Sequence, residues 1–483
     1  MDKIKNWLNN KLPTGSFTRN VVTLMTGTTF AQALLILMAP ILTRLYSPED
    51  FGVFSLYTSI LGILAVIACL RYELAIVLPE KDEEAANILV LSTVICIIFS
   101  FVVLVLVLLF KKHISTLLGV PQLSFWLWFM PLSLLVAGLS QAFSYWSTRR
   151  EHFKFLAVRQ ITQSSVTAVT QISIAHMTNI GVGGLIAGQI AGQAAATGKL
   201  ARQIYRDEGK KIISCVSEQE MKQMITRYKD LPLYSSWSGI LNTASIMMPP
   251  LLLGYFFTPA IVGFYALGHR VLSLPMSVIG GAVAQVFFPK ATEAQRIGDL
   301  EQITFDIFKQ LVSIVLVPIL LIAIVAPELF AIVFGPEWYV AGEYVKWLSG
   351  WIFFQFISSP ISILYFVLDK QRTLLVVNTS LLVTRIFVLI MGGIVGNSLL
   401  TMKMLGISGG IIYCISCVYI LHIAKVSLLK TLKHITKKLI AAIPFAIIPI
   451  VTLFIINNAL VFIFAAILSG IIFMFITLNK IRK

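Results

Sequence analysis

The feature that most constrains this chain is a series of fourteen apolar stretches, each long enough to cross a bilayer as a helix. A transmembrane helix needs about 20 predominantly apolar residues. Only 12% of the 483 residues are charged and 57% are apolar, whereas an ordinary soluble domain carries about 25% charged residues. These values exclude a disordered, fibrous or ordinary cytosolic protein. They predict an all-α integral membrane protein with about fourteen transmembrane helices.

The predicted spans lie between polar segments or Pro/Gly breaks. They cover Val21–Leu45, Phe51–Leu78, Ala86–Phe110, Ser124–Ser147, Phe155–Met177, Val182–Tyr205, Leu231–Phe257, Ile261–Phe288, Ile307–Phe334, Glu343–Leu368, Thr373–Val395, Leu405–Ile423, Leu439–Ile456 and Ala459–Leu478. A very short break separates the last two, so we expect twelve spans followed by a helical hairpin.

The distribution of basic residues predicts the orientation. The chain has 38 Lys and Arg against 22 Asp and Glu, a formal net charge of +16. With the N-terminus in the cytoplasm, 28 of the 38 bases fall on cytoplasmic segments, and the outside loops hold only Lys111, Lys112 and Lys403. Because cytoplasmic loops are enriched in Lys and Arg, we expect both termini in the cytoplasm. In a soluble protein this excess would suggest nucleic acid, but here it reflects topology, and no nucleic-acid partner is expected.

The chain also repeats itself. Ser47–Leu56 and Thr258–Leu267 share the pattern hydroxyl–Pro–x–x–apolar–Gly–x–aromatic–small–Leu at an offset of 211 residues. Two further pairs match in the same order: Leu78-Pro79 with Phe288-Pro289, and Gly181–Gly184 with Gly406–Gly410. Six crossings per repeat give two halves of the same orientation, a build in which transporters bind substrate between lobes. We therefore expect an N-lobe (1–205), a basic cytoplasmic linker (206–230), a C-lobe (231–426), and an interfacial helix with the final hairpin (427–483).

Basic residues inside the predicted spans suggest an anionic cargo. Seven bases lie there, and Arg71, Arg270 and Arg385 are the deepest, whereas acids are scarce. A charge at the bilayer centre is costly and is usually buried against protein or water. A cationic interior attracts an anion such as phosphate or pyrophosphate, which guanidinium groups bind well. The alternative for these three arginines is a structural ion pair. Arg159 lies near the inner face, where its side chain is expected to reach the membrane surface.

Polar side chains recur along several spans and suggest a wet path for sugars. The candidates are Gln163 in the fifth span, Asn242 in the seventh, and Asn378 seven residues before Arg385 in the eleventh. Hydrogen bonding between helices is the alternative. Glu73 is either an ion-coupling group or the partner of a cation on another span, since residues two apart on one helix do not face each other. Gly184, Gly188 and Gly192 form a small-residue face for close helix packing.

The segments Pro40–Gly52 and Leu70–Pro79 resemble Wzx-type lipid-linked oligosaccharide flippases. These are polysaccharide transporters of the multidrug/oligosaccharidyl-lipid/polysaccharide exporter superfamily. The resemblance covers nearly the whole chain and implies two MATE-like lobes and a bacterial inner-membrane location. It implies movement of undecaprenyl-pyrophosphate-linked sugar units to the periplasmic leaflet for an O-antigen, capsule or similar polymer. The implied partners are that glycan lipid, membrane lipids, and the polysaccharide polymerase and chain-length proteins.

No enzyme activity, cofactor or metal is expected. The sequence lacks a G-x-x-x-x-G-K-[ST] motif and a soluble domain to hold one, which favours coupling to an ion gradient or membrane potential. Two alternatives remain. A cation-coupled multidrug exporter of the same superfamily would share the fold but should display buried acids. A membrane-embedded polysaccharide polymerase or ligase would need a substantial periplasmic loop.

Overall fold

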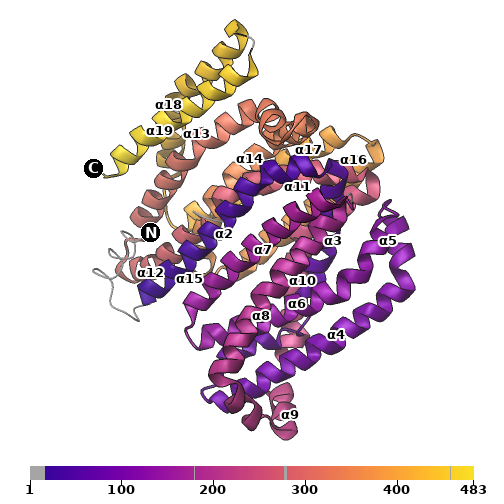
Figure 1. Cartoon of the computed structure of the whole chain (residues 1–483). Coiled ribbons are helices and arrows are strands. Elements are labelled where there is room, and N and C mark those ends of the chain that lie inside the picture. Colours follow the sequence, from indigo (N-terminus) through magenta and orange to yellow (C-terminus); the bar gives the residue numbers. More distant parts are fainter. Residues whose placement is uncertain (1–16, 179, 277–279, 457, 483) are drawn as a thin grey trace. The chain divides into compact units, whose positions relative to one another are not determined.

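The structure, a computed structural model, describes residues 17–178, 180–276, 280–456 and 458–482, and Figure 1 shows its helices. The described residues form helices joined by short connections and contain no strand. The chain divides into two compact units, Met1–Ala260 and Ile261–Lys483. The boundary falls between Ala260 and Ile261, shortly after the last complete helix of the first unit ends at Phe256. The lobe division taken from the sequence repeat stays a prediction.

The first unit contains nine α-helices and three short segments of other helical types among the described residues. They are α2 (Phe17–Leu45), α3 (Pro48–Ala65), the 3-10 segment η1 (Tyr72–Val77), α4 (Asp82–Leu117), α5 (Leu123–Trp126), the 3-10 segment η2 (Leu127–Phe129), α6 (Met130–Arg149), α7 (Phe153–Met177), α8 (Val182–Cys215), α9 (Glu218–Arg227), the π-helical segment η3 (Leu231–Ser235) and α10 (Ser236–Phe256). One of its cores joins α4, α6, α8 and η1 through residues such as Ile76, Ile88, Trp146 and Leu200.

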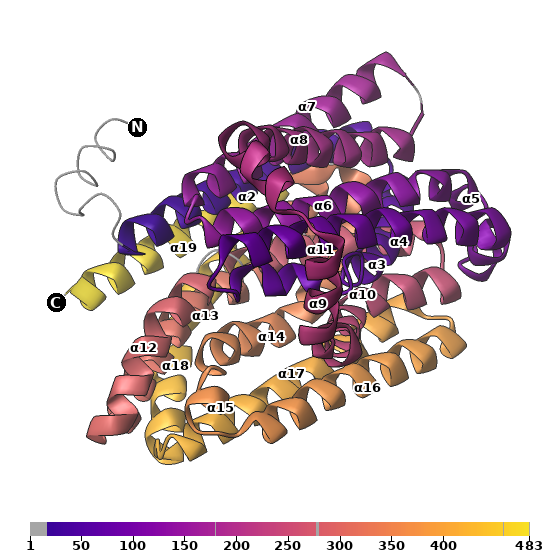
Figure 2. The ribbon, with the colours of Figure 1, turned by 90° about the horizontal axis from the view of Figure 1, so that it is seen from below.

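The second unit begins within α11. Its described elements are α11 (Pro259–Pro275), α12 (Gly281–Ile297), α13 (Leu300–Phe334), the 3-10 segment η5 (Pro336–Trp338), α14 (Tyr339–Ile361), α15 (Leu364–Val367), α16 (Gln371–Val395), α17 (Ser398–Ile423), α18 (Leu428–Ile456) and α19 (Ala459–Arg482). The helices α16 and α17 run side by side, as Figure 2 shows. The predicted interfacial segment and the span after it form one helix, α18, and a core of residues including Leu321, Phe462 and Phe473 joins α13 to the last hairpin.

Ten helical segments within the described residues are long and apolar enough to cross a membrane. The other predicted crossings fall on α3 with η1, on α7, on α8, and on α11 with α12. The helices α7 and α8 are long enough to cross a membrane, with 25 and 34 residues. They are not among the ten because their polar side chains lower the mean hydropathy. A multi-pass, all-helical membrane protein is thus confirmed, whereas the total of fourteen crossings stays a prediction.

The repeated Pro-Gly motif begins α3 and α11. Ser47 caps α3: its backbone N–H donates to Asp50 Oδ2 at 3.1 Å, and the Asp50 N–H donates to Ser47 Oγ at 3.2 Å. Pro48 occupies the first turn, where its missing N–H costs nothing. Gly52 then packs against the backbone of Pro259 so closely that a Cβ at this position would overlap the Pro259 carbonyl.

The three glycines of α8 form the predicted packing face. A Cβ at Gly184 would overlap the Tyr46 hydroxyl, and a Cβ at Gly188 or Gly192 would overlap Gln171 or Thr167 of α7. Small residues let two helix backbones approach closely within a membrane. The sequence prediction for this face is confirmed.

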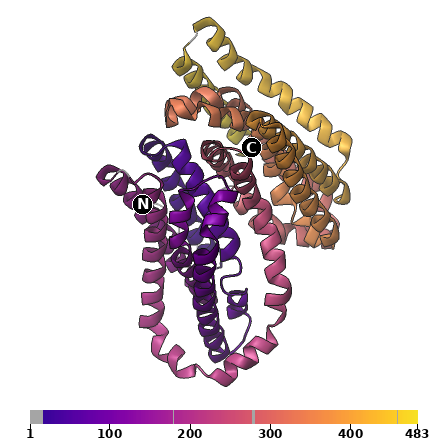
Figure 3. The ribbon, with the colours of Figure 1, turned by 90° about the vertical axis from the view of Figure 1, so that its right-hand side faces the viewer.

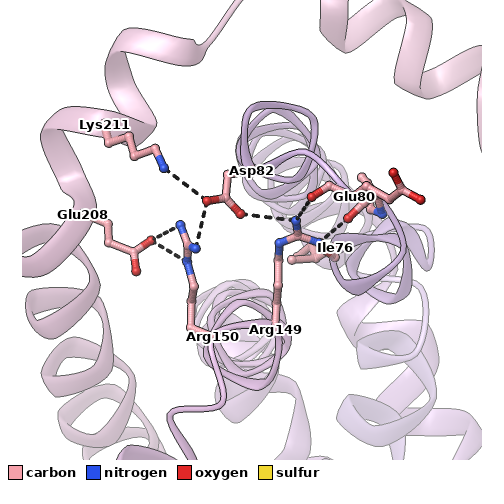
Figure 4. A network of polar contacts seen from close by, with 8 residues as sticks. Ile76, Glu80, Asp82, Arg149, Arg150, Glu208 and Lys211 are labelled. Atoms are coloured by element: carbon pink, nitrogen blue, oxygen red, sulfur yellow. Dashed lines mark hydrogen bonds and ion pairs between the residues drawn. The ribbon is translucent and has the colours of Figure 1, made fainter.

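The predicted cytoplasmic linker is largely helical, because α8 continues to Cys215 and α9 follows it. In Figure 3 this part of the chain passes round the ends of the indigo and purple helices. Asp82, at the start of α4, accepts from Arg149 at 3.2 Å, Arg150 at 2.9 Å and Lys211 at 3.1 Å (Figure 4). Arg150 also pairs with Glu208 at 2.9 Å. This network ties α8 to the ends of α4 and α6.

A buried amide completes the connection. Asn87 of α4 is fully buried, and its amide group donates to the carbonyl of Cys215 at 2.8 Å and to Glu220 Oε2 at 2.7 Å. Its oxygen accepts from the Ser217 N–H at 2.9 Å. The turn between α8 and α9 is therefore held on α4 by hydrogen bonds to a buried amide, which are electrostatically stronger than in water.

We expect Gly52→Ala to destabilise the protein, because the new methyl group meets a backbone carbonyl that cannot move aside. Overpacking of this kind costs about 1–3 kcal/mol. Gly198→Ala is the matched control, since Gly198 also lies in a helix and a Cβ there has nothing within 4 Å. Thermal unfolding of the two purified variants in one detergent measures the difference. Equal melting temperatures would contradict the close contact.

Candidate functional site

The second predicted span is not one helix, and the expectation of a continuous helix from Phe51 to Leu78 is wrong. The helix α3 ends at Ala65, and η1 begins at Tyr72. Between them Leu70 and Arg71 adopt left-handed conformations, with φ of 48° and 65°. Such conformations cost about 1–3 kcal/mol each and persist where the surroundings enforce them.

The backbone of this break is satisfied by tight turns. Leu70 donates to Ile67 at 3.0 Å, Tyr72 to Cys69 at 3.1 Å, and Leu74 to Arg71 at 3.1 Å. Ala68, Cys69, Tyr72 and Glu73 are buried. Irregular backbone at membrane depth is tolerated when it is buried in protein, and this segment meets that condition.

The break brings Arg71 and Glu73 together. Arg71 Nη1 lies 3.8 Å from Glu73 Oε1, and the two side chains are 26% and 1% exposed. The expectation that these residues do not face each other assumed a regular helix, and it is wrong because the turn at Arg71 removes that geometry. Glu73 Oε2 has no hydrogen-bond partner among the described residues. The first unit thus holds a buried carboxylate with a guanidinium beside it.

The Arg71 guanidinium packs against α10. A Cβ at Gly239 would lie 3.1 Å from Arg71 Nη2, so the glycine provides the room for the arginine. Asn242 lies one turn further along α10, and its side chain is exposed. Residues three apart share a helix face, so the structure brings Arg71 and Asn242, two predicted site residues, to one region of the first unit.

Gln163 lies elsewhere in the first unit. It is half-buried on α7, a helix that packs on α8 and α2. Eight residues further along this helix, Gln171 donates to the carbonyl of Leu185 at 3.0 Å, and the Tyr46 hydroxyl donates to the Gln171 carbonyl at 2.6 Å. At that end of α7 the polar groups form hydrogen bonds between helices, which is the alternative to a polar path for sugars.

The second unit contains a cluster of aromatic residues around Arg385. Arg385 of α16 is buried, with its guanidinium carbon 4.9 Å from the centre of the Trp351 ring of α14. The Tyr413 side chain of α17 lies close to Arg385. Cation–π contacts of this type are worth about 0.5–2 kcal/mol. We name Tyr265, His269, Trp351, Arg385 and Tyr413 the arginine–aromatic cluster.

The histidine links α11 to the cluster. The His269 ring stacks on Tyr265 with 5.5 Å between centroids and lies 5.8 Å from the Trp351 ring. Ser273 Oγ lies 3.5 Å from His269 Nδ1. Four helices of the second unit, α11, α14, α16 and α17, therefore contribute to this largely buried cluster.

The other two predicted residues of the second unit are exposed. Arg270 follows His269 on α11, and no described residue makes a hydrogen bond or ion pair with it. Asn378 lies two turns before Arg385 on α16 and is also exposed. Of the three deep arginines, Arg71 and Arg385 are thus held by neighbouring side chains, and Arg270 is not.

Sequence reasoning missed the aromatic members of the cluster. One signal was available: Tyr265, His269 and Ser273 recur at intervals of four residues, which places them on one face of a helix. Trp351 and Tyr413 carry no comparable pattern, because they meet Arg385 from separate helices.

Comparison with known proteins identifies the family. Residues 41–343 match the model of a family described as "Polysaccharide biosynthesis protein". The chain belongs to this family. The resemblance to polysaccharide transporters is thereby confirmed at the level of the family.

Individual relatives extend the comparison. The succinoglycan biosynthesis transport protein ExoT of Rhizobium meliloti (strain 1021) is 24% identical over 329 residues, 66% of this chain and 63% of that protein. The match thus spans less than two thirds of the relative's length. The lipid II flippase MurJ in an inward closed conformation superposes with a TM-score of 0.74 at 15% identity, over 96% of this chain and all of that one.

A MATE family multidrug transporter in an inward-facing conformation is also similar in fold. It has a TM-score of 0.67 at 14% identity and covers 83% of this chain and 98% of its own. This chain therefore shares the fold of these two transporters, and the MATE-like architecture expected from the sequence is confirmed.

We expect single neutralisation of the Arg71–Glu73 pair to cost more stability than neutralisation of both residues. Arg71→Gln leaves a buried carboxylate without its cation, and unsatisfied buried groups cost about 1–3 kcal/mol. Arg71→Gln/Glu73→Gln removes both charges, so its melting temperature should lie above that of Arg71→Gln. Thermal unfolding of the single and double variants gives the coupling energy. Strictly additive effects would show that the two residues do not interact.

Proposed function

We propose that this protein is a flippase that moves undecaprenyl-pyrophosphate-linked oligosaccharide units from the cytoplasmic to the periplasmic leaflet of the bacterial inner membrane. Alternating access is the proposed mechanism, and both termini are placed in the cytoplasm. Membership of a polysaccharide biosynthesis family supports a glycan as cargo. The observation that carries the proposal is Arg385, a buried guanidinium among aromatic rings in a membrane-spanning unit.

The arginine–aromatic cluster suits both parts of such a head group. A guanidinium presents five N–H donors in one plane, the arrangement that binds phosphate oxygens in pairs. Aromatic rings such as Tyr413 offer apolar faces with polar edges, which complement the faces and hydroxyl groups of sugars. In this proposal Arg385 binds the pyrophosphate, the buried Trp351 ring holds the guanidinium in place, and the half-buried Tyr413 ring contacts the sugars.

The remaining candidates have subordinate roles in the proposal. Arg71 and Arg270 are further anion sites along the path, and Asn242, Asn378 and Gln163 offer hydrogen bonds to sugar hydroxyls. The polyprenyl tail stays in the lipid, because each buried methylene favours an apolar surrounding by about 0.8 kcal/mol. The polysaccharide polymerase and chain-length proteins act on the delivered units, and the polymer is an O-antigen, capsule or related polysaccharide.

Glu73 is the candidate for ion coupling. It is almost fully buried, one of its oxygens is within ion-pair distance of Arg71, and the other has no partner among the described residues. A carboxylate in this setting can take up a cation or a proton when Arg71 moves to an anionic cargo. The proposed coupling thus makes cargo binding and ion binding dependent on each other.

The pairing of Glu73 separates this proposal from a multidrug exporter. An exporter of organic cations needs a carboxylate that is available to the drug, and Glu73 is held beside Arg71. Resistance to organic cations that is lost on deletion of the gene would favour the exporter. A polymerase or ligase would instead extend or transfer the glycan in the same reconstituted vesicles.

We expect Arg385→Gln to lower flipping of a labelled polyprenyl-pyrophosphate glycan in proteoliposomes by about ten- to a hundredfold. A hydrogen bond to a charged group is worth about 1.5–3 kcal/mol, which corresponds to this change in rate. Arg296→Gln is the control, because Arg296 is exposed at the end of α12. Wild-type flipping by a triple variant that replaces Arg71, Arg270 and Arg385 would refute the anion site.

A second experiment tests the aromatic contribution. Trp351 is 2% exposed and lies over Arg385, whereas Trp347, one turn earlier on α14, contacts Lys403 at 4.6 Å. We expect Trp351→Leu to lower flipping more than Trp347→Leu, because one stacking contact contributes about 0.5–1.5 kcal/mol beyond area burial. Both variants should be compared at equal amounts of folded protein in the vesicles. The reverse order would place the head group away from the cluster.

A further inference from the structure

A second polar site, whose lining includes none of the residues assigned to the cargo path, lies between α7 and α8 of the first unit. It is a pocket of about 140 Å³. Three basic residues line it, Lys154, Arg159 and Lys199, and Phe155, Val158 and Leu200 form much of its apolar wall. The proposed flippase function makes no use of these residues.

The positive charge of this pocket is not neutralised by neighbouring acids. No carboxylate lines it, and no described acidic residue forms an ion pair with Lys154, Arg159 or Lys199. The first acid after Lys199 along α8, Asp207, accepts from Gln203 and pairs with Arg206 at 3.3 Å. Three cations therefore converge where an anion would be favoured.

A hydrogen bond to α6 fixes the position of the Arg159 side chain. Its Nη1 donates to Ser140 Oγ of α6 at 2.6 Å, while its buried Nε has no partner among the described residues. The two lysines are exposed; Lys154 reaches the pocket from the start of α7 and Lys199 from the middle of α8. The result is one fixed guanidinium with two adaptable ammonium groups.

The pocket lies close to the expected membrane surface. Arg159 is six residues beyond the start of α7, about 9 Å along the helix at 1.5 Å per residue. Lys199 lies on α8 at the same level, because both residues line one pocket. Basic pockets between membrane helices on the cytoplasmic side are the sites where anionic headgroups bind.

The volume of the pocket indicates which kind of lipid head group it can hold. Sites for drug-sized ligands have about 300–1,000 Å³, so 140 Å³ suits a phosphodiester with its glycerol carbons and not an oligosaccharide head group. We propose that this pocket binds the phosphate of an anionic phospholipid of the inner leaflet. Lys154, Arg159 and Lys199 hold its oxygens, and an acyl chain lies on Phe155, Val158 and Leu200.

The test compares lipid retention by the full-length protein in native mass spectrometry, with phosphatidylglycerol or phosphatidylcholine as the added lipid. We expect the wild type to retain phosphatidylglycerol preferentially and Lys154→Gln/Lys199→Gln to lose at least about tenfold of that preference. Lys210→Gln/Lys229→Gln is the matched control, because it removes two charges from exposed positions of the same unit. The control should behave as the wild type.

Three results would overturn the proposal. They are equal retention of both lipids by the wild type, an equal loss in the two double variants, and displacement of phosphatidylglycerol by millimolar inorganic phosphate alone. Arg159→Lys keeps the charge and shortens the reach, so it should retain an intermediate preference if it folds. If Arg159→Lys does not fold, the comparison between the two double lysine variants still tests the proposal. Flipping of the glycan lipid is measured separately, so failure of one proposal leaves the other testable.

Discussion

A hydrocarbon environment offers no water to peptide groups or charges, and most of this structure follows from that restriction. The long helices satisfy their own backbone. Where the helix stops, after Ala65, short turns take over the hydrogen bonds and the surrounding helices cover the segment. Glu73 is accommodated there because Arg71 lies beside it. The irregular segment and its charges therefore belong together, since each would be costly without the other.

Polar residues in the helices have two different uses. On α7, Gln171 and its neighbours meet the glycine face of α8, and their hydrogen bonds hold two helices at short distance. In the second unit the polar groups instead gather around aromatic rings, with Arg385 over Trp351 and His269 stacked on Tyr265. Close packing with satisfied hydrogen bonds suits a rigid support, whereas rings and a guanidinium suit contact with a head group.

The sequence predicts the helical membrane fold, the repeated Pro-Gly turns and the packing face at Gly184, Gly188 and Gly192, because each depends on local spacing. It does not predict the break before Tyr72, since residues 66–71 contain neither proline nor glycine. The arginine–aromatic cluster depends on which helices become neighbours. Trp351 and Tyr413 look like ordinary apolar-span residues until α14, α16 and α17 pack together. Arg385 could be selected from its depth alone, but its surroundings could not.

The network around Asp82 also imposes an order of events during synthesis. Its partner Lys211 lies 129 residues later in the chain, and Asn87 meets Glu220 only 133 residues after itself. At ribosomal rates of 5–20 residues per second, about ten seconds separate these segments. During that interval the acidic start of α4 remains at the aqueous surface without its partner from α8. The hydrogen bonds of Asp82 and Asn87 with the segment after the sixth predicted span can form only when the ribosome has passed that span. A nascent chain that stalls earlier contains α4 but not the residues that bond to its start.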